Sequence, residues 1–112
     1  MSKYMLLLYH DPAGFTKMSP EEMQKATEKY MEWRKRSFVV DSGRLAGDTG
    51  RVIRSQNGQS RATDGPYSAT KEVFGGYYTI EAAGYDDAVK LSMDHPHLAH
   101  GGTIEVRHVF GT

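Results

Sequence analysis

The sequence contains no cysteine, and this absence excludes several classes of site at once. Disulfides, thiolate nucleophiles and cysteine-based zinc sites all need the missing thiol. An excess of one charge is also lacking, because 14 basic residues stand against 14 acidic ones. We therefore expect neither nucleic acid nor an anionic membrane as a partner. Neutrality also removes the repulsion between copies of the chain, which favours self-association.

Long hydrophobic runs are missing too. The apolar run at residues 4–9 stops at His10, Asp11 and Pro12. It is too short for the core of a signal peptide and far too short to cross a bilayer. The run predicts a buried strand, and we expect a cytoplasmic protein. A chain of 112 residues is long enough for a single domain, 1–112, with one hydrophobic core.

The start of a helix is clearly encoded at residue 19. Ser19 is placed as an N-cap, Pro20 suits the first helical position, and Glu22 completes a capping box. One face is then marked at alternating steps of three and four by Met23, Ala26, Tyr30, Trp33, Ser37 and Val40, all apolar except the serine. Gly43 is a natural stop. The pattern predicts one long helix from Pro20 to about Val40.

A hairpin is indicated by Asn57-Gly58, because both central residues of a type I′ turn need a positive φ. The flanking arms, 51–55 and 60–63, are polar and short. They follow a flexible connection at 45–50. We expect this hairpin to lie at a sheet edge or to project from the body.

Three further elements follow in the second half. Residues 77–82 predict a strand with Tyr78 and Ile80 on one face. A helix is expected from Tyr85 to about His95, with Gly84 as a weak N-cap and Pro96 as its end. Residues 103–110 predict the last strand.

This order of elements predicts an α+β fold. Strand, helix, hairpin, strand, helix and strand fit a ferredoxin-like βαββαβ sandwich with an extra hairpin arm. Both helices should cover one face of the sheet. The other face carries aromatic side chains, and a second copy would remove them from water. We therefore expect a homodimer, since twofold dimers are the commonest closed assembly.

The densest motif is Asp64-Gly65-Pro66-Tyr67, with Lys71-Glu72 a few residues later. Glycine and proline fix a turn, which holds Asp64 in one place. If the turn folds over the sheet, Asp64 becomes a candidate acid or base, and Lys71 with Glu72 a candidate ligand-binding pair. The alternative is a surface ion pair that contributes little to stability.

The same tetrapeptide resembles the signature of the DGPF proteins, a branch of the YCII-related superfamily, with Tyr67 in place of the usual phenylalanine. Residues 3–9, 71–78 and 101–107 match the family pattern in the right order, so the resemblance covers essentially the whole chain. It implies a dimeric α/β barrel. Some DGPF-family proteins are encoded near alternative sigma factors, which implies a regulatory role as an alternative to catalysis.

Histidines gather in the C-terminal quarter, at positions 95, 97, 100 and 108. Members of the superfamily resemble one another in a histidine–aspartate dyad near a cleft, often with an Asp-Pro pair ending the second helix. Here His95 separates Asp94 from Pro96, and residues 19–43 contain no histidine. The dyad is therefore not transferred to this chain, although His95 stays a candidate for proton transfer.

A metal site at His95, His97 and His100 is the competing interpretation. It needs convergent ligands, and no His-x-x-x-His repeat lies within a predicted helix. A solvated helix end, or a cap favoured by the helix dipole, explains the cluster more simply. We expect no metal and no other cofactor.

Two further candidates lie on strands. Glu105 and Arg107 share the face opposite Ile104 on the last strand, where Arg107 could clamp a carboxylate or phosphate. An Arg–Glu pair is the alternative. His10, at the end of the first strand, is another candidate ligand-binding residue. Phosphate-loop, Rossmann, zincin and nucleophile-elbow motifs are absent, which disfavours nucleotide cofactors and serine-based hydrolysis.

The leading hypothesis is therefore a protein that binds a small polar or anionic molecule in a dimer cleft. Asp64 and His95 would transfer protons without a cofactor, as in a lyase, isomerase or hydrolase of a small organic acid. Lys71, Glu72, Arg107 and His10 would hold the ligand. A non-catalytic binding or regulatory module is the alternative, and a purely structural domain is a third possibility.

Overall fold

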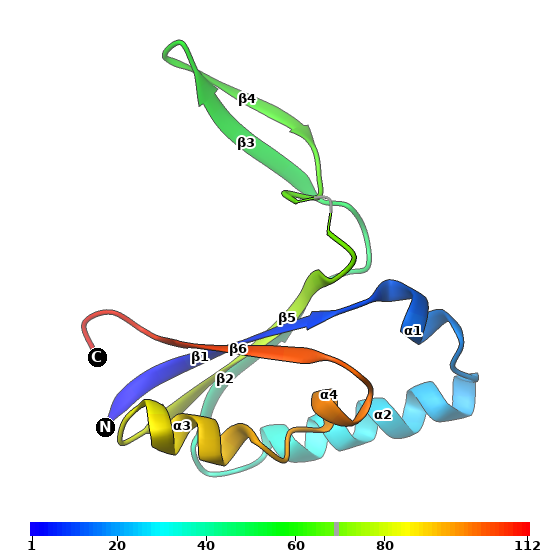
Figure 1. Ribbon diagram of the computed structural model, residues 1–112, viewed down its shortest axis with the longest axis vertical. Helices are drawn as coiled ribbons and strands as arrows, with labels where there is room; N and C mark the ends of the chain where they lie inside the picture. Colours follow the sequence, from blue (N-terminus) through cyan, green and yellow to red (C-terminus); the bar gives the residue numbers. More distant parts are fainter. Residues whose placement is uncertain (69) are drawn as a thin grey trace.

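The computed structural model describes residues 1–68 and 70–112, and for Phe15 and Thr16 it describes the backbone alone. The described chain forms six strands and four short or medium helices, in this order: β1 Ser2–His10, α1 Pro12–Thr16, α2 Pro20–Arg34, β2 Val39–Arg44, β3 Arg51–Gln56, β4 Gln59–Asp64, β5 Val73–Ala82, α3 Tyr85–Ser92, α4 Pro96–Ala99 and β6 Thr103–His108. The body sheet has the order β2-β5-β1-β6 with every neighbour antiparallel, and β3 and β4 form a separate ribbon (Figure 1). The predicted α+β fold with a hairpin arm is confirmed.

Helix α2 begins where the sequence predicts and ends earlier. The Ser19 hydroxyl accepts a hydrogen bond from the Glu22 amide at 3.1 Å, and the Glu22 carboxylate accepts one from the Ser19 amide at 3.3 Å. The helix ends at Arg34, so the predicted extension to Val40 is wrong. Residues Val39–Arg44 form strand β2, because adjacent valines suit a pleated strand and β5 supplies the backbone partners.

The second predicted helix is also divided. Helix α3 ends at Ser92, and Pro96 starts the short helix α4 instead of stopping a helix. His95 is the N-cap of α4, since its Nδ1 accepts the His97 amide at 3.0 Å. Proline is well suited to the first position of a helix, where no amide proton is needed.

The β3–β4 arm stands clear of the body, as Figure 1 shows. Asn57 has φ 51° and Gly58 φ 78°, which confirms the predicted turn with two positive φ values. Of the two predicted placements, projection is the one observed. β5 continues the chain on the far side of the arm, so the arm is an insertion between two neighbouring strands of the sheet.

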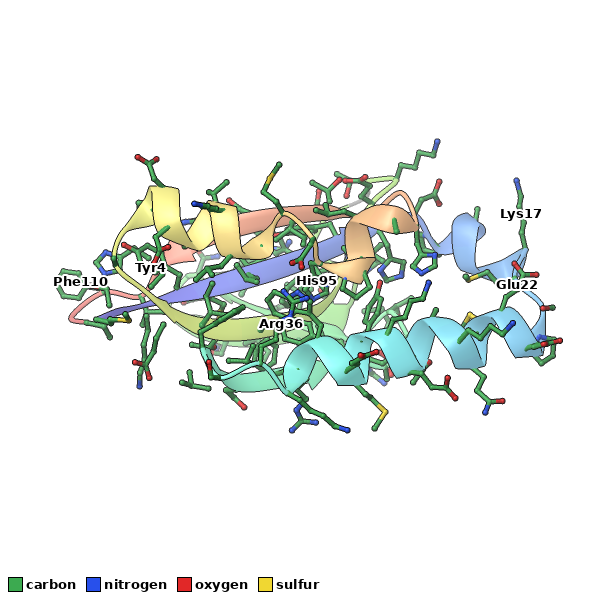
Figure 2. The ribbon with its side chains drawn as sticks, turned by 90° about the horizontal axis from the view of Figure 1, so that it is seen from below. Tyr4, Lys17, Glu22, Arg36, His95 and Phe110 are labelled. Carbon is green, nitrogen blue, oxygen red and sulfur yellow. The ribbon has the colours of Figure 1, made fainter. Side chains whose placement is uncertain are left out.

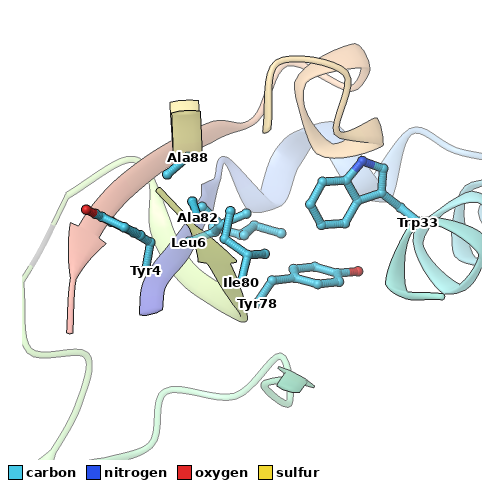
Figure 3. Packing of buried hydrophobic residues seen from close by; sticks show 8 residues of the cluster. Tyr4, Leu6, Trp33, Tyr78, Ile80, Ala82 and Ala88 are labelled. Carbon is cyan, nitrogen blue, oxygen red and sulfur yellow. The ribbon is translucent and has the colours of Figure 1, made fainter. Parts of the chain in front are cut away.

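The core lies between the sheet and the helices α2 and α3 (Figures 1 and 3). Leu6 and Ile80 have no exposed surface, and Tyr78 and Trp33 pack beside them. Alternate residues of β1 and β5 point to this face, which confirms for β5 that Tyr78 and Ile80 share one face. Both helices lie on the same side of the sheet, as predicted. The opposite face, called the open face below, carries the partly exposed side chains of Met5, Leu7, Tyr9 and Tyr77.

No helix among residues 1–68 and 70–112 combines the length and the apolar character needed to span a membrane.

Candidate functional site

The double glycine of β5 shapes one end of the sheet. Leu8 pairs with Gly76 and Tyr9 with Phe74, so Gly75 is the extra residue of a β-bulge. A Cβ atom at Gly75 would overlap the imidazole ring of His10. The glycine therefore makes room for His10 at the end of β1, just before α1.

His97 ties three elements together at this end. Its Nε2 lies 2.7 Å from the carbonyl oxygen of Tyr9, and its Nδ1 lies 2.8 Å from the hydroxyl of Tyr30 on α2. A carbonyl can only accept, so Nε2 carries the proton and Nδ1 accepts from Tyr30. Burial lowers the pKa of His97, partly opposed by the bond to Tyr9. His97 is thus a neutral buried link between α4, α2 and β1.

His95 lies deeper, between α2 and the α3–α4 segment (Figure 2). It is 2% exposed, and ring centroids of Trp33 and Tyr78 lie 4.5 and 4.7 Å away. Its Nδ1 accepts the His97 amide, while its Nε2 has no hydrogen-bond partner among the described residues. Burial, with His97 beside it, lowers the pKa of His95 to about 4.

The expectation of a solvated helix end is therefore wrong for His95 and His97, which are 2% and 3% exposed. His100 alone of this cluster is exposed. In the described part of the chain, no three histidine, aspartate or glutamate side chains converge as metal ligands would. The physical reason is that aromatic side chains of α2 lie against both imidazoles: Tyr30 contacts the rings of His95 and His97, and Trp33 contacts that of His95.

Asp94 anchors the same segment from outside. Arg36 contacts its two carboxylate oxygens at 2.8 Å each, and the Trp33 indole donates to it at 3.1 Å. The hydrogen bonds from Arg36 and Trp33 lower the pKa of Asp94. A bidentate guanidinium contact of this kind fixes orientation as well as charge. The α3–α4 connection is therefore held firmly against the end of α2.

A hollow of about 330 Å³ opens above this network, between the end of β1, α1 and the turn after α4. We call it the His10 pocket; His10, Asp11, Lys17 and His100 supply its titratable lining. The His10 ring lies 6.4 Å from the ring of His97. Burial and the nearby Arg44 lower the pKa of His10, partly offset by Asp11. At neutral pH this imidazole is mostly uncharged and can accept a proton.

A larger hollow of about 580 Å³ lies between α2 and α4. It is a shallower surface groove, and its charged groups include Arg36 and Asp94, which already neutralise each other. The smaller His10 pocket is lined by two imidazoles, those of His10 and His100, together with Lys17. We therefore regard the His10 pocket as the better candidate site.

The structure brings some of the predicted site residues toward this pocket. His10 lines it, and Lys71 lies 3.5 Å from Asp11 at its rim. Glu72 accepts a hydrogen bond from Thr103 at 3.1 Å. Burial lowers the pKa of His97, and the Glu72 carboxylate is a small opposing influence on that pKa. These residues come from three separate strands or loops and meet only because β1, β5 and β6 are neighbours.

Other predicted residues lie elsewhere. The Asp64 side chain is 83% exposed at the root of the arm and pairs with Arg51 at 3.6 Å. Arg107 pairs with Glu105 at 3.5 Å on the open face, where Glu105 also accepts from the Tyr9 hydroxyl. His95 is buried behind His97. The catalytic roles of Asp64 and His95 and the ligand role of Arg107 stay predictions.

The sequence does not single out Tyr30 or Lys17 for the site, and it indicates His97 only as a possible metal ligand. The apolar spacing places Tyr30 on the buried face of α2, although a tyrosine on a buried face usually needs a partner for its hydroxyl. That need is the signal that points to His97. Lys17 carries no such signal, because a lysine in a short connection is ordinarily solvated.

Comparison with known proteins identifies the family. The model of the YCII-related domain matches residues 2–111. An uncharacterized protein of Rhizobium meliloti (strain 1021) is 27% identical over 99 residues, which cover 81% of this chain and 77% of that protein. The match extends over both halves of the body sheet and the arm between them. The chain belongs to the YCII-related domain family.

Proposed function

We propose that the chain binds a small anionic or polar organic molecule in the His10 pocket and exchanges a proton with it through His10. The observation that carries the proposal is that His10, an imidazole of lowered pKa, and Lys17 line the same hollow. Lysine attracts a carboxylate or phosphate as a point charge. A neutral imidazole beside the bound anion is a suitable general base.

The buried network behind the pocket supports this proposal by holding His10 in place. His97 fixes the end of β1 through the Tyr9 carbonyl, one residue before His10. Gly75 leaves the space that the His10 ring occupies. Proton transfer needs such positional control, because its rate depends on a hydrogen-bond distance between base and substrate.

His10 replaces Asp64 and His95 as the proposed proton-transfer residue. Asp64 is largely exposed and engages Arg51, and His95 is enclosed by aromatic rings. Lys71 and Glu72 keep a proposed role at the rim, near Asp11 and His97 respectively. The reaction class is proton transfer on a small organic acid, the step that lyases and isomerases share.

The assembly we propose is a homodimer that packs through the open face of the sheet. Met5, Leu7 and Tyr77 lie on this face and are only partly buried within one chain. Apolar patches on a sheet face are commonly covered by an interface. A regulatory protein that binds a ligand without turnover is the second candidate, and the resemblance to DGPF proteins favours it.

Calorimetry with inorganic phosphate and a panel of small carboxylates at pH 7 tests the pocket. His10→Gln and Lys17→Ala should each weaken binding about tenfold or more, which corresponds to at least about 1.4 kcal/mol. His108→Gln is the matched control, because His108 lies at the other end of the sheet, stacked on Tyr4. If both pocket variants bind as tightly as the control, the pocket is assigned wrongly.

Turnover separates the two candidate functions. An enzyme loses turnover in His10→Gln while ligand binding persists in part, whereas a regulatory protein binds without turnover in any variant. Asp64→Asn belongs in the same series. We expect it to retain activity, and a loss of turnover with intact binding would return the proton-transfer role to Asp64.

A further inference from the structure

Two imidazoles line the His10 pocket, and they come from distant parts of the chain. His10 ends β1, and His100 follows α4 in the turn before β6. Figure 1 shows α1, α4 and the end of β1 at the same end of the sheet. His10 is partly buried, whereas His100 is exposed. The pocket therefore holds one shielded imidazole and one that exchanges protons readily with water.

The backbone next to each of these imidazoles is held by His97. Its Nε2 donates to the carbonyl oxygen of Tyr9, the residue before His10, at 2.7 Å. Its carbonyl oxygen accepts the His100 amide at 3.3 Å and the Gly102 amide at 3.1 Å. Burial lowers the pKa of His97, and His10 and His100 each lower it further, so both are electrostatic neighbours of this ring. One buried residue thus positions two proton carriers around one hollow.

The buried pair Tyr30–His97 lies against both imidazoles but offers no path for a proton between them. The ring centroids of His10 and His97 are 6.4 Å apart, and those of Tyr30 and His100 are also 6.4 Å apart. The Tyr30 hydroxyl donates to Nδ1 of His97, whose Nε2 donates to a backbone carbonyl. A carbonyl oxygen has no proton to pass on, so the network is closed. His10 and His100 therefore exchange protons separately, each with a bound molecule or with water.

The charges around the pocket favour a small anion. Asp11 is matched by Lys71 at 3.5 Å, and its carboxylate also accepts the Ala13 amide at 3.0 Å. Lys17 makes no ion pair with the side chains that the structure describes. Its ammonium is therefore left to attract a carboxylate as a point charge. A hollow of about 330 Å³ is at the small end for ligand sites, so the molecule is small.

A carboxylate by itself gives an imidazole no proton to remove. Its own proton is already lost at neutral pH, and a C–H group beside it is too weakly acidic for a base of this strength. A ketone on the neighbouring carbon changes this, because the charge left behind is delocalised onto the ketone oxygen. That oxygen then takes up a proton, which a second imidazole supplies. Two imidazoles and one lysine therefore suit an oxo acid that forms an enol.

We propose that the His10 pocket takes a small enolisable oxo acid, with His10 as the general base and His100 as the general acid. His10 removes a proton from the carbon beside the ketone, and the electrons of that C–H bond form a carbon–carbon double bond. The π electrons of the ketone move to its oxygen, which receives the proton of the His100 imidazolium. The enol is the product, and water restores both imidazoles. This assignment rests on the proton exchange proposed above for His10, and it adds the substrate class and the second proton carrier.

Deuterium exchange at carbon tests this pair with pyruvate and 2-oxobutanoate as probes. The full chain is incubated with each probe in deuterium oxide, and proton NMR follows the signal of the carbon beside the ketone. We expect exchange to be faster with the native protein, and His100→Ala to lower its rate at saturating probe at least about tenfold while calorimetry gives an unchanged affinity. Free imidazole should restore exchange in His100→Ala, because position 100 is exposed. His108→Ala is the matched control, since His108 is stacked on Tyr4 at the other end of the sheet.

The outcomes separate this assignment from the proposed function. Oxo acids that bind in calorimetry without faster exchange would overturn the acid–base pair and leave ligand binding in the pocket standing. Equal rates in His100→Ala and the native protein would remove His100 from the reaction. A loss that imidazole does not restore, in a variant shown to be folded by circular dichroism, would assign His100 a structural role instead. If neither phosphate nor any carboxylate binds, the proposed function itself is wrong.

Discussion

Removal of one hydroxyl, in Tyr30→Phe, tests the buried network that supports the pocket. In the native chain the Tyr30 hydroxyl donates to Nδ1 of His97 at 2.8 Å, and His97 is only 3% exposed. Burial raises the pKa of Tyr30 to about 12, so the donor proton is present throughout the accessible pH range. Phenylalanine keeps the ring and removes only the donor.

The size of the effect follows from what is left behind. Without Tyr30 as donor, the buried Nδ1 acceptor of His97 loses its partner, which costs about 1–3 kcal/mol. For a chain of this length 1 kcal/mol corresponds to about 4 °C in the melting temperature. We therefore expect Tyr30→Phe to melt about 4–12 °C below the native protein. The hydrogen bond from Tyr78 to the Tyr30 carbonyl is unaffected by the change.

Urea unfolding is a direct assay, because the chain contains a single tryptophan. Trp33 is 3% exposed in the core and packs against His95, so its fluorescence reports the unfolding of this part of the core. Tyr67→Phe is the matched control, since its side chain is 80% exposed and its hydroxyl stays hydrated. If the two variants differ by less than about 0.5 kcal/mol, the Tyr30 hydroxyl does not serve the buried imidazole and the reasoning is refuted.

Two further predictions concern the same region. The pKa of His95 falls from 6.5 to about 4 on folding, so between these pH values the imidazole is protonated in the unfolded chain and neutral in the folded chain. The free energy of unfolding should therefore be full above pH 6.5 and decrease by roughly 2–3 kcal/mol as the pH falls to about 4. Urea unfolding at several pH values should show this slope in the native protein and a weaker slope in His95→Phe; equal slopes would contradict the prediction. A Cβ atom at Gly102 would overlap the His97 ring, whereas one at Gly47, between β2 and β3, would meet nothing within 4 Å. Thermal unfolding should therefore show Gly102→Ala strongly destabilised, by more than about 2 kcal/mol, and Gly47→Ala nearly native; similar values would place His97 elsewhere.

Local signals account for the elements that were predicted correctly. The capping box at Ser19 and the turn at Asn57-Gly58 each act within four residues, and both are observed. The position at which α2 ends, by contrast, depends on strand β5, which is distant in the sequence and pairs with β2. Residues 35–40 continue an apolar spacing of three and four, yet Val39 pairs with Ile80 in the sheet. The backbone hydrogen bonds that β5 supplies outweigh the local pattern.

In the candidate site, too, local signals predict some features and distant partners determine the others. The sequence indicates His10 as a candidate because an imidazole ends a buried strand. Nothing in the local sequence indicates that Gly75 accommodates His10. The stiff turn after Asp64 indicates a fixed position for this residue, but the stiffness of the backbone does not determine whether the carboxylate is buried or exposed. Its carboxylate lies at the root of an arm that leaves the body.

The amino-acid sequence by itself determined the absence of thiol chemistry, the start of α2, the hairpin turn and the alternation of buried residues along the central strands, because composition, caps, turns and the period of a strand are local properties. Tertiary structure alone decided that β2 is a strand, that His95 and His97 are buried, and that His10 and Lys17 line one hollow. These outcomes depend on which segments become neighbours in space. The burial of an imidazole is a property of its surroundings, and its surroundings exist only after β1, α2 and α4 have packed together.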